Sequence, residues 1–568
     1  MGNIPPVFAR PQIFQKTQAL AIERCDDLTP RHGHKPPSRR IMRHPAGALH
    51  DTIGAGSRNG LPPMSSEHFD VVIIGAGLSG IGAGYRLETR CPQKRYVIFE
   101  ARSEMGGTWD LFRFPGVRSD SDMFTFAYPF RPWNNAKVIA DGAAILNYLR
   151  ETAREFGIDR RIRFEHRVHS ASWSSRDARW LLAVKNSATG ETVECTCDFL
   201  YGCTGYYRYD TGFEPAFPGA ERFRGELLHP QHWPEDLDYA GKRVVVIGSG
   251  ATAVTMVPAM SRTAAHVTML QRSPSYILSL PSEDAVANLL HRFLPVSAAH
   301  RIARWKNILI STGIYQFCRR APKVARRVLR QGAAKSLPHS YETDKHFNPR
   351  YEPWDQRLCV APDSDLFRSI SEGSASVVTD QIDTFTEHGV RLASGRQLQA
   401  DLIVSATGLE MLALGAVRLS VDGVPVDPGH TFVYKGTMLS NVPNFAFCMG
   451  YTNASWTLRA DLVSLYVCRL LNYMDRHGYR TCKPVCDPAS LEARPLLDLT
   501  SGYVTRATAN LPKQAAKRPW LVRQNYILDL LGMKLSRMED GILNFGRPSA
   551  HTRNDAREET LVASSANN

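Results

Sequence analysis

The sequence predicts an α/β protein that contains two Rossmann-like dinucleotide-binding domains. Two strand–glycine–helix fingerprints carry this prediction, one starting at Phe69 and one at Lys242. A third observation is the ordinary globular composition of the 568-residue chain, with 43% hydrophobic and 22% charged residues, which excludes disorder throughout and collagen-like repeats. Because no run of about 18 strongly apolar residues occurs, we do not expect a membrane-spanning segment.

Residues 1–64 are predicted to form a disordered N-terminal extension. They are rich in proline and basic residues and show no sustained periodicity. They lack the apolar core of a secretory signal, and their acids and prolines disfavour a transit peptide. Translation from Met64 would leave the start of the first domain complete. Residues 546–568 are small and polar, and are predicted to form a flexible tail.

The first fingerprint runs from a buried strand, 69–74, through a glycine-rich turn into a helix. The first glycine permits the tight turn, the second lets the backbone approach a pyrophosphate, and the third lets the helix pack closely on the strand. The free N–H groups and dipole of the helix N-terminus then hold the phosphates. The next strand, 96–99, ends in an acid that can accept a hydrogen bond from a ribose 2′-OH. Because the second fingerprint, described next, suits a phosphorylated ribose, FAD fits the free ribose here best, and the residues expected to bind it are Gly75, Gly77, Ser79, Gly80 and Glu100.

The second fingerprint repeats the pattern, with a strand at 242–247 followed by Gly-x-Gly-x-x-Ala and a helix. The next strand, 266–270, is followed by Arg272 and not by an acid. Because an arginine suits a 2′-phosphate through bidentate contacts, this half is predicted to bind NADPH rather than NADH. The alternative is that Arg272 is a solvated surface residue. The residues expected to bind NADP here are Gly248, Ser249, Gly250, Ala251, Thr252, Ala253, Arg272 and Ser273.

Two similar strand ends, 198–205 and 401–408, indicate where the chain crosses between domains. Because the second lies beyond the NADPH-binding pattern, we expect a discontinuous FAD domain with the NADPH domain inserted into it. The expected boundaries are 65–210 for the first part of the FAD domain, 211–378 for the NADPH domain, and 379–545 for the second part of the FAD domain with the substrate pocket.

The net charge of +14 is concentrated in residues 285–335, which hold eleven Lys or Arg and no Asp or Glu. Apolar residues recur there at helical spacing, at Ile302, Trp305 and Leu309, and the basic residues Arg301, Arg304 and Lys306 lie on or near the opposite side. We expect a helical basic insertion that binds weakly and peripherally to an anionic membrane; a solvated helical face is the alternative. No nucleic-acid motif accompanies these charges, so nucleic acid is not expected as a partner.

Eleven cysteines are scattered along the chain without a C-x-x-C pair or the spacing of a zinc site. We therefore expect no metal site, and thiols kept reduced in the cytoplasm. The expected location is cytoplasmic, or associated with a membrane at its cytoplasmic face. A disulfide or ferredoxin reductase also pairs FAD with NADPH, but it needs a redox cysteine pair that the sequence lacks.

Between the two fingerprints, the segment Phe223-Arg-Gly-Glu-Leu-Leu-His-Pro-Gln-His-Trp-Pro234 matches the pattern F-x-G-x-x-x-H-x-x-x-W-P. This segment resembles the fingerprint of Baeyer–Villiger monooxygenases, whereas the sister flavin-containing monooxygenases carry Tyr or Phe at the position of Trp233. Segments 106–122, 354–359 and 450–458 are similar to the bacterial ethionamide-activating monooxygenase group. The likeness runs from about residue 69 to about residue 545.

The resemblance implies roles for residues that match its motifs. Asp120 would be the active-site aspartate beside the flavin, and Arg357 would be the catalytic arginine. The backbone of Val168, at the end of a strand expected at 162–168, would contact the adenine. Trp456 would line the pocket or belong to the core. Residues expected to flank the flavin are Gly107, Thr108, Trp109, Asp110 and Leu111, and those expected to face the nicotinamide end of NADP are Arg118 and Ser119.

The resemblance also implies an interdomain linker formed by Phe223, Gly225, His229 and Trp233. His229 would anchor this linker or position NADPH, rather than transfer protons. Trp233 would stiffen the linker while NADP moves after it has reduced the flavin.

The implied reaction is an NADPH- and O2-dependent oxygenation. Reduced FAD reacts with O2 to give a C4a-peroxyflavin, which attacks a ketone when anionic and oxidises sulfur or nitrogen when protonated. Arg357 would stabilise the anion, and Asp120 would orient Arg357 through a charge-assisted pair. We expect ester or lactone products from ketones, and oxidation of sulfides or thioamides as a further activity. The alternatives are an N- or S-oxygenating flavin-containing monooxygenase and a redox-sensing protein that only binds the nucleotides.

Overall fold

The computed structural model describes residues 67–547, all within one compact unit of the chain. The predicted N-terminal extension, with Met64, and tail residues 548–568 lie outside the described residues. Between residues 67 and 547, every helix is too short or too polar to span a bilayer.

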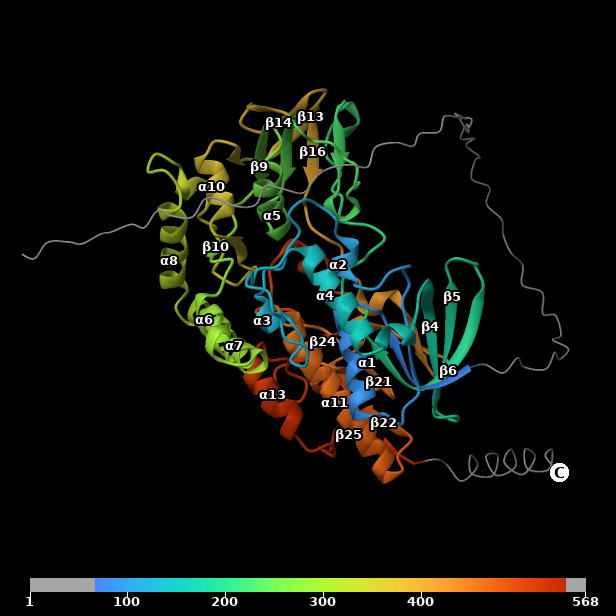
Figure 1. Cartoon of the computed structure of the whole chain (residues 1–568). Coiled ribbons are helices and arrows are strands. Elements are labelled where there is room, and N and C mark those ends of the chain that lie inside the picture. The colour runs from blue at the N-terminus through green and yellow to red at the C-terminus, as the bar shows by residue number, and fades with distance from the viewer. Residues whose placement is uncertain (1–66, 548–568) are drawn as a thin grey trace, which may run out of the picture. The chain divides into compact units, whose positions relative to one another are not determined.

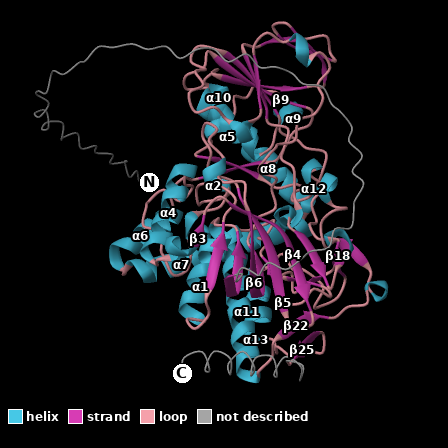
Figure 2. Ribbon diagram, turned by 90° about the vertical axis from the view of Figure 1, so that its right-hand side faces the viewer, coloured by secondary structure: helices cyan, strands magenta, loops and turns pink. Residues whose placement is uncertain are grey.

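The first sheet has nine strands and carries the first glycine fingerprint (Figure 2). Its strands are β1 Glu67–Ile74, β2 Tyr96–Phe99, β3 Ile162–Arg163, β4 His166–Ser174, β5 Arg179–Asn186, β6 Thr192–Gly202, β17 Arg418–Val421, β18 Val424–Val426 and β21 Phe445–Phe447. The centre is parallel, because β1 pairs with β2 on one side and β6 on the other. Strands β17 and β21 come from far along the chain and pair with β4 and β6. Segments on both sides of the second fingerprint therefore build this sheet.

The second sheet has five strands, all parallel, in the order β12-β9-β8-β16-β7. Its strands are β7 Glu226–Leu228, β8 Arg243–Ile247, β9 His266–Gln271, β12 Ala375–Thr379 and β16 Leu402–Ser405. An antiparallel three-stranded sheet, β13 Ile382–Thr386, β14 Gly389–Leu392 and β15 Gln397–Gln399, stands between β12 and β16 in the chain. Four strand pairs complete the described strands: β10 Ile277–Leu280 with β11 Cys359–Pro362, β19 Val433–Tyr434 with β20 Met438–Leu439, β22 Thr481–Pro484 with β25 Leu543–Gly546, and β23 Ala493–Pro495 with β24 Lys513–Ala515.

The same glycine turn follows the central strand of each sheet. Gly75 and Gly248 both have positive φ, +101° and +140°, which an L side chain rarely adopts. A Cβ atom on Gly75 would lie 2.7 Å from the carbonyl oxygen of Cys203, and one on Gly248 would lie 2.3 Å from that of Ala406. The two similar strand ends noted in the sequence thus pack against the two glycine turns, one in each sheet.

This packing corrects the predicted boundary at residue 379. Leu402–Ser405 pairs in parallel with Val244–Ile247 and therefore belongs to the second sheet, not to the second part of a FAD domain. The strand expected at 162–168 is also wrong. The short strand β3 ends at Arg163, a turn follows in which Glu165 has a positive φ of 59°, and the nine-residue strand β4 then continues past Val168 to Ser174.

The helices lie on and between the sheets (Figure 1). Helix α1 Leu78–Arg90 starts at the first glycine turn and packs against α11 Trp456–His477, and α5 Ala251–Met260 starts at the second turn. The predicted basic insertion consists of α6 Ala285–Phe293, α7 Val296–Arg320 and α8 Pro322–Lys335. The remaining helices are α2 Thr108–Leu111, α3 Met123–Phe126, α4 Gly142–Glu155, α9 Thr343–His346, α10 Asp365–Ser371, α12 Gly502–Ala507 and α13 Tyr526–Leu535.

Candidate functional site

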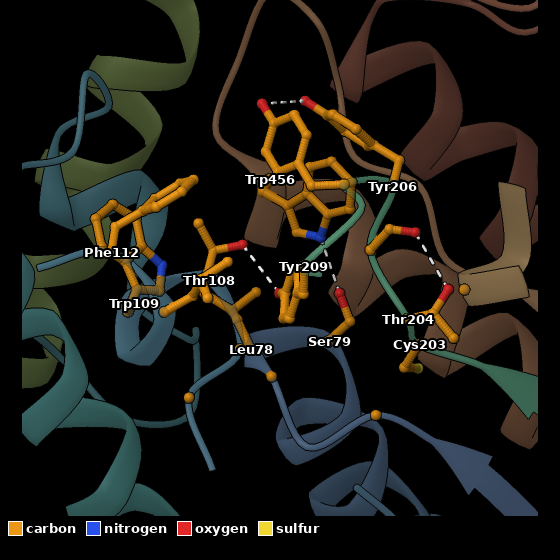
Figure 3. Close-up of a pocket in the computed structure, with 18 of the residues that line it drawn as sticks. Leu78, Ser79, Thr108, Trp109, Phe112, Cys203, Thr204, Tyr206, Tyr209 and Trp456 are labelled. Atoms are coloured by element: carbon orange, nitrogen blue, oxygen red, sulfur yellow. Dashed lines mark hydrogen bonds between the residues drawn. The ribbon is translucent and has the colours of Figure 1, made fainter. Parts of the chain in front are cut away.

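A cavity of about 470 Å³ lies between the first glycine turn and the start of α5 (Figure 3). Its walls come from segments spread over most of the described chain. The sequence-predicted residues that line it are Gly75, Gly77, Ser79, Glu100, Gly107, Thr108, Trp109, Leu111, Arg118, Ser119, Asp120, Val168, Ala251, Thr252 and Arg357. The fold thus brings most of the candidates from the two fingerprints and the later motifs to one place.

The first fingerprint forms a cradle of backbone at one end of this cavity. Helix α1 has Gly77 at its N-cap and no side-chain cap, so its first N–H groups remain available. A Cβ atom on Gly107 would lie 3.1 Å from Cα of Gly77, so a side chain there would fill the space between the two glycines. A pyrophosphate fits such a cradle because it needs N–H donors and close backbone approach.

Glu100 stands where a ribose would be recognised. It is buried, and its carboxylate accepts hydrogen bonds from the backbone N–H of Ala76 (2.7 Å) and of Arg102 (3.0 Å). Burial raises the pKa of Glu100 above its ordinary value, although these N–H donors oppose the rise. The carboxylate is thus held in one orientation on the cavity wall.

Aromatic side chains form another part of the cavity wall. The indole N–H of Trp456 donates to the hydroxyl of Ser79 (2.8 Å), and the Trp456 ring lies 5.0 Å from that of Tyr206 (Figure 3). Trp456 lines the cavity and also packs against the hydrophobic core of the first sheet, so both alternatives left open by the sequence apply to it. The hydroxyl of Tyr209 is 3.2 Å from that of Thr108.

The tyrosines of the segment 206–209 were not among the sequence candidates. They follow the carboxyl end of β6, where ligands bind in open α/β sheets, so their position after a central parallel strand was the signal that could have found them.

The guanidinium of Arg357 lines the cavity. Among residues 67–547, no side chain or carbonyl forms a hydrogen bond or ion pair with its guanidinium. Burial alone would lower the pKa of Arg357, but the nearby Tyr206, Tyr503 and Asp120 side chains raise it above the ordinary value. The guanidinium is therefore a fixed positive charge whose donors are free to bind a ligand.

Asp120 lies in the same cavity, but the expected direct pair with Arg357 is wrong. Within the part of the chain that the structure describes, no oxygen of Asp120 comes within 4.0 Å of an Arg357 nitrogen. Burial raises the pKa of Asp120, and the charges of Arg357 and Arg118 oppose this rise. The Asp120 carboxylate and the Arg357 guanidinium therefore interact by Coulombic attraction at longer range and not through a direct hydrogen bond.

Asp110 is a second correction, because it does not line the cavity. It is buried in a cluster of three arginines, at 2.8 Å from Arg102, 3.0 Å from Arg113 and 3.3 Å from Arg150. This cluster holds α2 in place, so Asp110 supports its neighbours Trp109 and Leu111 and does not touch the cavity itself.

Arg118 and Ser119 line the cavity with their orientations fixed by neighbours. Arg118 pairs with Asp365 at the start of α10 (2.5 Å), and the Ser119 hydroxyl donates to the carbonyl of Ser121 (2.9 Å). The Nε atom of Arg118 is buried without a hydrogen-bond partner in the described chain. An unpaired buried donor of this kind can serve a ligand.

The second fingerprint presents an open helix N-terminus. Helix α5 starts at Gly250 without a side-chain cap, and a Cβ atom on Gly250 would meet nothing within 4 Å. Arg272 is exposed at the end of β9, and its side chain has no bonding partner within residues 67–547. Among the predicted NADP residues, Gly248, Ser249, Gly250, Ala253, Arg272 and Ser273 lie outside the cavity lining, whereas Ala251 and Thr252 belong to it.

His229 joins the segments that cross between the two sheets. Its Nε2–H donates to the carbonyl of Gly408 (3.1 Å), and the N–H of Gln231 donates to its Nδ1 (3.2 Å). Gln231 in turn donates to the carbonyls of Arg208 and Tyr209, both at 2.9 Å. Because both ring nitrogens are engaged and burial lowers the pKa of His229, this residue is suited to hold the crossing segments and not to transfer protons.

The other residues of this segment are packing residues. Trp233 is buried in the apolar core of the second sheet, where it lies edge-on to Tyr239. Phe223 packs against Phe385, and Gly225 has no room for a side chain because a Cβ atom would lie 2.4 Å from the carbonyl of Asp401. No cluster of three or more His, Cys, Asp or Glu suited to a metal ion occurs in the described residues.

Comparison with known proteins places this site in a family. The family described as "Flavin-binding monooxygenase-like" matches residues 69–294. The chain is 52% identical over 486 residues to the FAD-containing monooxygenase EthA of Mycolicibacterium smegmatis, which covers 85% of this chain and 98% of that protein.

Two solved structures share the fold. The oxidized steroid monooxygenase bound to NADP matches with a TM-score of 0.67 and 21% identity, covering 84% of this chain and all of that one. The cyclohexanone monooxygenase from Rhodococcus sp. Phi1 bound to NADP+ matches with a TM-score of 0.65 and 20% identity, covering 85% of this chain and 100% of that one. The predicted α/β class is thus confirmed.

Proposed function

The chain belongs to the FAD-containing monooxygenases of the Baeyer–Villiger and flavin-binding monooxygenase type, and from this premise we propose that it uses FAD, NADPH and O2 to insert an oxygen atom beside a ketone carbonyl. The observation that carries the proposal is the unpartnered Arg357 guanidinium on the wall of the cavity. The products would be esters or lactones. Sulfides or thioamides would be further substrates.

The residues at the two fingerprints fit the two cofactors. The Gly77–Gly107 cradle and the free start of α1 suit the FAD pyrophosphate, and Glu100 suits its ribose. The open start of α5 and the exposed Arg272 suit NADP with its 2′-phosphate. When bound, FAD supplies hydride acceptance from NADPH and activation of O2.

In this proposal, Arg357 supplies the electrostatic contribution to the reaction. An attack on a ketone places negative charge on oxygen, and a fixed guanidinium beside the carbonyl stabilises that charge. Because Arg357 has no side-chain or carbonyl partner within residues 67–547, no bond to this part of the chain must break before its donors turn to the substrate. A donor of this kind is typically worth about 10²–10³ in rate.

Asp120 would be a positioning residue for Arg357. Its carboxylate is one of the groups that raise the pKa of Arg357, and its own pKa is raised by burial. When ionised, the Asp120 carboxylate would stabilise the Arg357 guanidinium through charge and leave the Arg357 donors unoccupied. The aromatic wall of Trp109, Tyr206 and Trp456 would exclude water from the reacting groups.

The test is product identification. Purified, FAD-loaded protein is incubated with NADPH, O2 and a mixture of a methyl ketone and a thioether, and the products are analysed by mass spectrometry. We expect an ester from the ketone. Sulfoxide as the sole product would contradict the proposal and place the protein with the N- or S-oxygenating monooxygenases.

A further inference from the structure

The helical insertion and α13 present an unusual surface. Of the nineteen large hydrophobic residues that are exposed in the described chain, fourteen lie on α6, α7, α8 and α13. Phe293 is 76% exposed and Leu535 is 72% exposed. Exposed apolar residues normally occur singly, so a concentration of this kind marks an interaction surface.

Each helix of this surface shows its apolar side outward. The exposed residues recur three and four apart, as in Val286, Leu289 and Phe293 of α6 and in Leu528, Leu531 and Leu535 of α13. Helix α7 exposes Ile302, Trp305 and Leu309.

Helix α7 also turns a basic residue inward. Arg304 is buried and donates to the carbonyls of Phe124 (2.8 Å) and Ala127 (2.7 Å). The sequence predicts that basic residues lie opposite the apolar stripe of Ile302, Trp305 and Leu309. In the structure this stripe is exposed and Arg304 is buried. Arg301, Arg319 and Arg320 of α7 remain exposed, so the outer side of this helix carries both apolar and basic residues.

The four helices are neighbours. Helix α7 packs against α6 and α8, and Trp305 of α7 lies 6.0 Å from Tyr526 of α13, ring to ring. Figure 1 shows α6, α7 and α8 in succession, with α13 next to α7. We call this surface the α6–α8/α13 face.

The charge of this face is positive and only partly compensated, since Lys306, Arg319, Arg326 and Arg330 pair with acids outside the insertion. Six exposed basic residues have no hydrogen-bond or ion-pair partner within residues 67–547: Arg292, Arg301, Arg320, Lys323, Arg327 and Lys335. No acid occurs in 285–335, and Asp529 of α13 is engaged by Arg459 (2.5 Å) and by the hydroxyl of Tyr451 (2.9 Å). A second copy of this chain would bring the same positive charges against this face, which disfavours self-association. An anionic lipid surface complements both the charges and the apolar side chains.

The inner side of the face reaches the cavity wall. Ile308 of α7 and Tyr526 and Ile527 of α13 form one apolar cluster with Tyr451, Leu458 and Ala454. Tyr451 and Ala454 line the cavity that contains Arg357. One cluster of packed side chains therefore connects the inner side of this face with the cavity wall.

We propose that the α6–α8/α13 face docks on an anionic membrane, and that the substrate is an apolar ketone or sulfide dissolved in the bilayer. The docking half of this proposal stands on the face alone, whereas the substrate half rests on the function proposed above.

The first test is vesicle flotation of the FAD-loaded full chain. We expect binding to phosphatidylcholine vesicles that contain about one-third phosphatidylglycerol at about 50 mM salt, and weaker binding at about 500 mM salt. Binding to pure phosphatidylcholine should be weaker still. Protein that stays unbound with anionic vesicles at low salt would overturn the docking proposal.

Charge variants sharpen this test. The triple variant Arg320→Gln, Lys323→Gln, Arg327→Gln should bind anionic vesicles roughly 100-fold more weakly, because each basic residue near a membrane contributes about fivefold. The matched control is Arg176→Gln, Arg179→Gln, Lys185→Gln, three exposed basic residues by β5 on the first sheet, which should bind like the unchanged protein. Equal binding by both triple variants would overturn the assigned face.

Apolar variants test the other contact. Phe293→Glu and Leu535→Glu should each weaken flotation, whereas Val424→Glu, at a residue 67% exposed on β18, should not. Sedimentation velocity without lipid provides the opposing outcome. A dimer that Phe293→Glu dissociates would assign the face to self-association and overturn membrane docking.

The substrate half is tested by rate. The docking variants should oxidise a short, water-soluble ketone as fast as the unchanged protein, and a long-chain ketone held in anionic vesicles more slowly. Equal rates on both ketones would overturn the substrate assignment and leave docking to the flotation result. Inactivity of the unchanged protein on every ketone would count against the proposed function instead.

Discussion

Arg272 is the residue that sets the choice between the two nicotinamide cofactors in this account. It stands exposed at the end of β9, where an acid would select a free ribose, and its side chain has no bonding partner among the described residues. The Arg272 guanidinium would bind the 2′-phosphate of NADPH directly through a charge-assisted hydrogen bond.

We expect Arg272→Ala to raise the KM for NADPH by about 10- to 100-fold, because a charge-assisted bond to phosphate is worth roughly 1.5–3 kcal/mol. The KM for NADH should change little. Steady-state NADPH oxidation measures both values. Arg262→Ala, which removes another exposed arginine near α5, is the control and should leave both unchanged. Parallel loss of NADPH and NADH affinity would contradict the assignment to the 2′-phosphate.

Gly212 leaves the space that the imidazole ring of His229 occupies. A Cβ atom on Gly212 would lie 2.0 Å from Cε1 of His229. Gly212→Ala should displace the ring and break its bonds to Gly408 and Gln231, at a cost of about 1–3 kcal/mol in unfolding free energy. Thermal unfolding of the holoprotein measures the loss. Gly332→Ala on α8, where a Cβ atom meets nothing within 4 Å, should not lower the melting temperature. A Gly212→Ala variant as stable as the unchanged protein would show that His229 does not hold the crossing segments.

At the scale of an element, α7 carries a buried histidine that makes its stability depend on pH. Neither ring nitrogen of His300 has a hydrogen-bond partner in the described chain, and the residue is buried. Burial, with Arg304 and His291 nearby, lowers the pKa of His300 to about 4. Because the folded pKa lies below the ordinary value of 6.5, the folded state loses stability as the pH falls from 6.5 towards 4.

The His300→Phe variant should lose less stability on acidification than the unchanged protein. The difference between pH 7.5 and pH 5 should be roughly 2 kcal/mol of unfolding free energy. Melting temperatures at the two pH values measure it, and His339→Phe, at an exposed position, should behave like the unchanged protein. Identical pH profiles for His300→Phe and the unchanged protein would show that His300 is not the titrating group.

Over the whole molecule, local sequence patterns predict the elements that depend mainly on neighbouring residues. The central strands were predicted closely, as β2 at Tyr96–Phe99 shows, because apolar runs followed by glycine turns leave few alternatives. Which sheet a strand joins is a long-range property, so the sequence predicts the wrong domain for the pattern at 401–408, whose strand pairs with β8 in the second sheet.

The residues of the site that belong to sequence motifs were predictable, whereas their long-range partners were not. Arg357, Asp120 and the two fingerprints were found as motifs, and the fold brings them to one cavity. The partners of Asp110 could not be found in this way, because Arg102, Arg113 and Arg150 meet around it only after α2 and α4 have packed. The outward apolar side of α7 was equally hidden, since the sequence shows a stripe but not what covers it.

The proposed reaction depends on a contribution of the Arg357 guanidinium to oxygenation of the ketone. Its most direct measurement is the rate of ester formation by Arg357→Ala and Arg357→Lys, with FAD content and NADPH-dependent flavin reduction recorded for each variant. Arg350→Ala, an exposed arginine outside the cavity lining, is the control. We predict that Arg357→Ala keeps its FAD and loses about 10²–10³ in ester formation, while Arg357→Lys retains part of the rate. Ester formation by Arg357→Ala at the rate of the unchanged protein would contradict the account.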